Sequence, residues 1–94
     1  MPFEIVATRP APDRTYTKVG RLIAGEDGQV HLFLDGKGEI LTIPRTDILC
    51  TLQGLSIQGL VLSDSGKRLI VIDRDGREYQ VLVSQVREMF RSWP

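Results

Sequence analysis

Residues 29–43, QVHLFLDGKGEILTI, decide the fold class of this 94-residue chain. Over 29–35 the apolar residues alternate with polar or mixed ones, which is the period of a half-buried β-strand. A turn with two glycines at 36–38 follows, because glycine accepts the positive φ angles that tight turns need. A second apolar run at 39–43 then ends at Pro44, which has no backbone donor for a strand ladder.

The same pattern of short strands and turns extends to both ends of the chain. Two prolines make 8–14 a loop, since neither can donate to a ladder. Asp75-Gly76 is the strongest hairpin signal. Thr46 or Asp47 is a plausible helix cap, and so is Ser84. The sequence predicts strands at 3–7, 15–24, 29–35, 39–43, 57–63, 68–73 and 77–83, and helices at 46–52 and 84–92.

The two halves of the chain align without a gap when one is shifted by 39 positions. This shift superposes the strands of 15–52 on those of 57–93, and a shift of 38 then aligns the helices, with Ile48 on Val86 and Leu52 on Phe90. The shift of 39 pairs Gly20 with Gly59, Leu22 with Val61, Val30 with Leu69 and Leu32 with Val71. We interpret the halves as two β-β-β-α units that arose by duplication. Alternation alone would also align any two meanders, so the similarity has a second explanation.

The expected architecture is therefore mainly β, within an α+β class. About seven short antiparallel strands follow from the pattern, with a leading strand at 3–7 and two short helices. Each unit would present an apolar sheet face and an apolar helix stripe that it cannot bury alone. We expect a single domain over 1–94, packed as a small barrel or sandwich.

Composition excludes several functional classes. Twelve basic residues balance twelve acidic ones, whereas a duplex-DNA binder carries a basic excess. Cys50 and His31 are the single residues of their types, so an intrachain disulfide is excluded and a zinc site lacks ligands. A thiol enzyme built from Cys50, His31 and Asp47 lacks motif spacing. We expect no enzyme activity, cofactor or metal, no membrane span, and a cytoplasmic location.

Single-stranded nucleic-acid binding remains compatible with the sequence. Such sites combine aromatic platforms on a sheet with basic residues. Tyr16 and Lys18 share one strand face, and His31 and Phe33 share another. The alternative is that Phe33 belongs to the core and Tyr16 to a strand edge. The candidate residues are Arg14, Tyr16, Lys18, Arg21, His31 and Phe33, and the expected partner is single-stranded DNA or RNA.

A resemblance to a known group points the same way. Residues 14–43 begin with RTYTKVG and continue, after a variable stretch, with EDGQVHLFLDGKGEILTI. This resembles small proteins of bacterial chromosomes and mobile elements with a Tyr-x-x-Val-Gly strand, an Asn/Lys-Asp-Gly turn and a Leu-x-Leu-Asp strand. Some of these resemble single-stranded-DNA-binding proteins of the oligonucleotide-binding type. The resemblance implies such a fold and such a ligand.

A second resemblance concerns residues 38–45, GEILTIPR. This segment is similar to the Gly-x-Ile-x-Ile-Pro step of swapped-hairpin transcription factors of the antitoxin type. The resemblance implies an intertwined dimer that binds DNA through basic loops.

A protein-interaction module is the alternative function. Val86, Met89, Phe90 and Trp93 fall on one helical face, and the chain has more apolar residues than six short strands need. The surplus predicts a contact with a protein partner or a second copy of the chain, as in a homodimer. The residues expected at this interface are Leu60, Leu62, Phe90 and Trp93.

Overall fold

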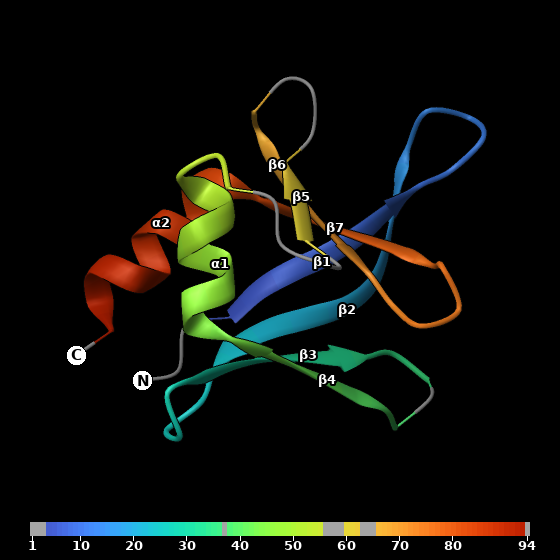
Figure 1. Cartoon of the computed structure of the whole chain (residues 1–94). Coiled ribbons are helices and arrows are strands. Elements are labelled where there is room, and N and C mark those ends of the chain that lie inside the picture. Colours follow the sequence, from blue (N-terminus) through green and yellow to red (C-terminus); the bar gives the residue numbers. More distant parts are fainter. Residues whose placement is uncertain (1–3, 37, 56–59, 63–65, 94) are drawn as a thin grey trace.

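The computed structural model describes residues 4–36, 38–55, 60–62 and 66–93. Helix α1 spans Arg45–Leu52 and helix α2 spans Val83–Ser92 (Figure 1). The strands are β1 (Glu4–Pro10), β2 (Tyr16–Ala24), β3 (Gln29–Leu34), β4 (Ile40–Pro44), β5 (Leu60–Leu62), β6 (Arg68–Ile72) and β7 (Glu78–Leu82).

The strand count differs from the expectation of about seven comparable strands. Six strands have five residues or more, whereas β5 has three. The rest of the predicted strand 57–63 lies outside the described residues. The mainly β class with two helices is confirmed, with a sheet of six full strands and one short edge strand.

All strands join one antiparallel sheet in the order β4-β3-β2-β1-β7-β6-β5. The leading strand β1 connects the two three-stranded meanders, because it pairs with β2 on one side and with β7 on the other. The sheet curls into a half-barrel (Figure 1). Over the described residues β4 and β5 are its edges and do not pair with each other, so the single sheet is a half-barrel that is open between these edges, and the predicted small barrel or sandwich is confirmed only as a curled sheet.

The core fills the concave side of this sheet, which we call the inner face. Alternate residues of six strands point into it, and both helices pack over it. Helix α1 contributes Ile48, and α2 contributes Val83, Val86 and Met89. The strand residues of the core are Ile5, Ala7, Leu22, Val30, Leu32, Leu34, Ile43, Leu69, Val71, Tyr79 and Val81.

Two local predictions were wrong. The first strand continues through Pro10 instead of ending before 8–14, since the two residues that precede Pro10 pair with β2 and a proline is tolerated where a strand ends. Both helices also begin one residue earlier than predicted. Pro44 and Leu82 occupy the cap positions, and neither helix has a side-chain cap. The chain enters each helix directly from a strand, so Thr46 and Ser84 are already helical.

Candidate nucleic-acid interface

The convex side of the sheet faces away from both helices, and we call it the outer face. The strand register places Val6 beside Arg21, Arg21 beside Phe33, and Phe33 beside Ile40 on this side. These residues alternate with the core residues of the same strands. Among the described residues, the large exposed apolar side chains on the outer face are Val6, Tyr16, Ile40, Ile72 and Leu82.

A β-bulge in β2 brings the candidate basic residues together. Strict alternation would place Lys18 and Arg21 on opposite sides of the sheet, because they are three residues apart. The register between β1 and β2 shifts by one residue here, so Val19 has no paired residue on β1. The extra residue changes the phase of the strand. As a result Tyr16, Lys18 and Arg21 all belong to the outer face.

Two arginine–aromatic pairs lie on this face. The Arg68 guanidinium lies 4.0 Å from the centre of the Tyr16 ring, and that of Arg21 lies 5.7 Å from the centre of the Phe33 ring. Arg21 also forms an exposed ion pair with Glu4 at 3.2 Å. A guanidinium over an aromatic face is attracted by the ring quadrupole.

Arg68 was missed by sequence reasoning, although a signal was present. It precedes Ile70 and Ile72 by two and four residues, and alternation puts all three on the same side of β6. Its closeness to Tyr16 was not predictable from local pattern, because β6 and β2 are brought together only through β1 and β7.

His31 lies on the outer face near the edge of the sheet. Its Nδ1 lies 3.1 Å from Thr42 Oγ1, and its Nε2 lies 3.2 Å from the Asp27 carboxylate. The backbone N–H of Gln29 donates to Asp27 and, together with His31, lowers the pKa of that carboxyl. The His31 and Phe33 rings are 6.5 Å apart and tilted, so the imidazole is held in place beside the Phe33 ring.

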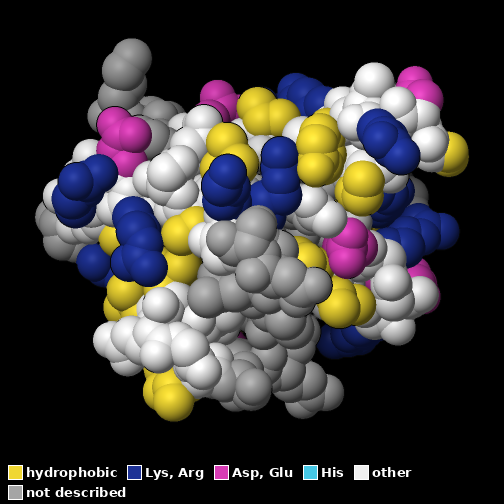
Figure 2. All heavy atoms as spheres, turned by 90° about the horizontal axis from the view of Figure 1, so that it is seen from above, with side chains coloured by type: hydrophobic (Ala, Val, Ile, Leu, Met, Phe, Trp, Pro, Cys, Tyr) yellow, Lys and Arg dark blue, Asp and Glu magenta, His cyan; other side chains and the backbone are white. Residues whose placement is uncertain are grey.

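Five of the six residues predicted for a nucleic-acid site share the outer face, with Tyr16 and His31 toward opposite ends of β2. Tyr16 and Lys18 are exposed, and His31 and Phe33 are half-buried on the same side. Arg14 lies beyond the strands in the β1–β2 turn, where it has a positive φ of 69° and an exposed side chain. Figure 2 shows the molecule from above, with Lys and Arg side chains close to exposed hydrophobic ones; no histidine is visible from this side, so the view does not present the surface around His31.

The residues expected at a protein interface lie elsewhere. Phe90 and Trp93 are half-buried against the core, with ring centres 5.8 Å apart. The Arg45 guanidinium lies 4.5 Å from the centre of the Trp93 ring, so α1 and α2 are joined by this contact. The side chains of Leu60 and Leu62 lie outside what the structure describes.

The residues considered for catalysis do not form a group. Cys50 is half-buried in α1, which packs on the inner face, whereas His31 belongs to the outer face. Within the described ranges there is no group of three or more His, Cys, Asp or Glu residues that could hold a metal ion.

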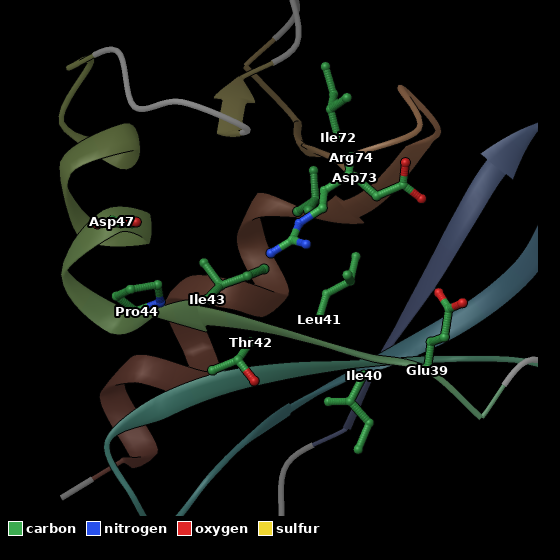
Figure 3. Close-up of a pocket in the computed structure, with 11 residues that line it drawn as sticks. Glu39, Ile40, Leu41, Thr42, Ile43, Pro44, Asp47, Ile72, Asp73 and Arg74 are labelled. Atoms are coloured by element: carbon green, nitrogen blue, oxygen red, sulfur yellow. The ribbon is translucent and has the colours of Figure 1, made fainter.

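A cleft of about 670 Å³ opens between β4 and the end of β6. Leu41 and Ile43 point into it from β4, and the Arg74 side chain reaches across it toward Ile43 (Figure 3). Its charged lining consists of the Arg74 guanidinium and the carboxylates of Glu39, Asp47 and Asp73.

Comparison with known proteins gives no further guide, because the chain matches no family model, curated protein or solved structure. Neither helix in the described part of the chain is long and apolar enough to cross a membrane.

Proposed function

We propose that this chain is a non-enzymatic binding module that holds single-stranded nucleic acid on the outer face of its sheet. The observation that carries the proposal is the bulge at Val19. It aligns Tyr16, Lys18 and Arg21 on one uncovered surface next to Phe33.

The chemistry of this surface supports the proposal. Nucleic-acid bases stack on aromatic rings and on guanidinium planes, and both occur here as the Tyr16–Arg68 and Phe33–Arg21 pairs. Lys18 lies on β2 between the two pairs and is exposed, as a phosphate contact must be. The function is also the one implied by the resemblance of residues 14–43 to small bacterial proteins, some of which are of the single-stranded-DNA-binding type.

The charges of the outer face limit the expected affinity. Lys18, Arg21 and Arg68 are opposed by Glu4 and Glu78, so few phosphates can be neutralised. About three contacts would give a slope of log K against log salt of about −2 for single strands. We therefore expect weak binding that is seen at low salt.

The first prediction concerns Lys18. We expect the fluorescence anisotropy of a fluorescein-labelled oligothymidylate of fifteen nucleotides to increase when the wild-type chain is added at low salt. Lys18→Glu should raise the Kd about tenfold, because it replaces a phosphate contact by a repulsion. Arg87→Glu is the matched control: it makes the same charge change at an exposed position on α2, and it should leave the Kd within about twofold if α2 takes no part in binding.

Two results would contradict the proposal. One is the absence of any anisotropy change at low salt and high protein concentration. The other is an equal loss of binding in the Lys18 and Arg87 variants, which would indicate attraction by net charge alone and no defined surface.

Docking of a protein partner on the same face is the second candidate. Val6, Ile72 and Leu82 are exposed there, and aliphatic side chains cannot stack with bases as rings do. A protein partner would be lost on Val6→Glu, whereas oligonucleotide binding depends mainly on Lys18 and Arg21.

The duplication hypothesis and the compartment belong to this proposal as well. The element order β2-β3-β4-α1 and β5-β6-β7-α2 is what a duplicated β-β-β-α unit would produce.

The single cysteine favours the cytoplasm. A module of this kind would need no cofactor or metal.

A further inference from the structure

Strand β4 has backbone groups that face away from the sheet. It is an edge strand, and over the described residues it pairs with β3 alone. The N–H of Leu34 donates to the carbonyl of Glu39, so the odd-numbered residues of this strand face β3. Because antiparallel residues alternate in direction, the N–H and C=O groups of Ile40 and Thr42 point outward.

This edge is complementary to itself. If a second copy approaches antiparallel with a two-fold axis at Leu41, Ile40 of one copy lies opposite Thr42 of the other. Both residues present N–H and C=O to the partner strand, so the two symmetric pairs can exchange four hydrogen bonds. Ile40, which is 52% exposed, would then be covered. Pro44 has no N–H and would end the ladder.

The same register brings one pair of opposite charges together in the cleft, where Asp47 and Asp73 also lie. Glu39 of one copy falls opposite Ile43 of the other, on the inner side of the joined sheet. Arg74 reaches over Ile43 from the β6–β7 turn (Figure 3). Each copy therefore brings a carboxylate to the guanidinium of the other, twice by symmetry.

We propose that two copies of this chain associate through antiparallel pairing of β4 with β4 about a two-fold axis at Leu41, with Glu39 of each copy beside Arg74 of the other. The result is one continuous sheet across both copies. The contact is short, and interfaces that bury less than about 1,000 Å² are weak or transient. The dimer should therefore dissociate on dilution. This inference does not depend on nucleic-acid binding.

The first test measures mass by light scattering over a concentration series. We expect the wild-type mass to rise from 10.6 kDa toward twice that value as the chain approaches millimolar concentration. Thr42→Pro should keep the chain monomeric, because it removes an outward N–H without breaking a bond to β3. Thr42→Val is the matched control: it loses the same hydroxyl, keeps the N–H, and should still dimerise.

The second test locates the two-fold axis by cross-linking. Residues directly opposite in a non-hydrogen-bonded pair have Cα atoms about 4.5 Å apart, within disulfide range. In a Cys50→Ala background, Leu41→Cys should therefore form a disulfide-linked dimer under mild oxidation. Ile40→Cys in the same background should not, because it faces Thr42 of the second copy.

A wild-type chain that stays monomeric at millimolar concentration would overturn the proposal. So would a dimer in which Ile40→Cys cross-links as readily as Leu41→Cys, or one that survives Thr42→Pro. None of these readouts involves an oligonucleotide, so failure here is distinct from failure of the proposed function.

Discussion

Replacing Gly20 by alanine should lower the free energy of unfolding by about 1–3 kcal/mol, the usual range for overpacking a tight site. A Cβ at this position would overlap the backbone carbonyl oxygen of Phe33 on the neighbouring strand. Backbone in a sheet cannot move aside as a flexible side chain can, so β2 and β3 would have to separate. Chemical denaturation followed by circular dichroism would measure the loss.

The matched control for Gly20 is Lys18→Ala. It lies on the same strand, and its side chain is exposed, so its free energy of unfolding should stay within about 0.5 kcal/mol of the wild type. Equal stabilities of Gly20→Ala and Lys18→Ala would show that the strands do not approach as closely as the structure describes. A stable Gly20→Ala variant would also weaken the account of the bulge, which lies next to this glycine.

Replacing Asp73 by alanine should cost about 2–3 kcal/mol of unfolding free energy, because one carboxylate organises the β6–β7 turn. Its Oδ1 accepts hydrogen bonds from the backbone N–H groups of Asp75 and Arg77, each at 2.9 Å. Its Oδ2 accepts from the Tyr79 hydroxyl at 2.9 Å. Tyr79 is only 3% exposed, so alanine leaves a buried donor without its acceptor. Thermal and urea unfolding would report the effect.

Tyr79→Phe separates the two parts of this effect. It removes the buried hydroxyl and leaves the two backbone bonds to Asp73 intact, so it should cost less than Asp73→Ala. If Tyr79→Phe costs as much as Asp73→Ala, the backbone bonds of the turn contribute nothing, and our account of the turn is wrong.

The ionisation of the Asp73 carboxylate should also make the free energy of unfolding depend on pH. Burial alone would raise the pKa of Asp73, but hydrogen bonds from Arg77, Tyr79 and Asp75 outweigh it and hold the pKa below the ordinary value of 3.8. A carboxyl with a lowered pKa in the folded state stabilises the fold above the pKa of the unfolded state. That contribution is lost as the pH falls through the folded pKa.

Asp73→Asn should therefore lose less stability than the wild type when the pH falls below 3.8. Urea unfolding at neutral pH and at stepwise lower pH would measure the difference. Asp13 and Asp27 also have lowered pKa values, but they are present in both proteins and cancel in the comparison. If the free energy of unfolding falls equally steeply with decreasing pH in the wild type and in Asp73→Asn, the prediction is wrong.

Local pattern predicted most of the elements because their signals are local. The strand at 29–35 and the turn at 75–76 follow from alternation and from glycine, and both occur in the structure. Each helix begins one residue earlier than predicted because the chain passes from strand to helix without an intervening loop. A capping side chain near Thr46 or Ser84 has no loop to cap in such a transition.

The candidate site was only partly predictable. Tyr16 and Lys18 share a face by simple alternation, so their proximity followed from the sequence. Arg21 lies on the same face only because of the bulge at Val19. A bulge changes which side of the sheet the following residues face, and it has no distinct residue pattern in the sequence. Arg68 lies near Tyr16 because of pairings between strands that are distant in the sequence, and a short stretch of sequence cannot reveal such pairings.

The position of β1 between the two meanders has a consequence for synthesis on the ribosome. Its hairpin with β2 can form early, and β3 and β4 can add to it in order, since these contacts are local. Its other neighbour, β7, is among the last segments to be made. Until then the far side of β1 is an open strand edge, and closing it requires a contact across most of the chain, which is slow to form. The last strand to emerge therefore completes the second meander by pairing with β6, and it joins the two meanders in the middle of the sheet by pairing with β1.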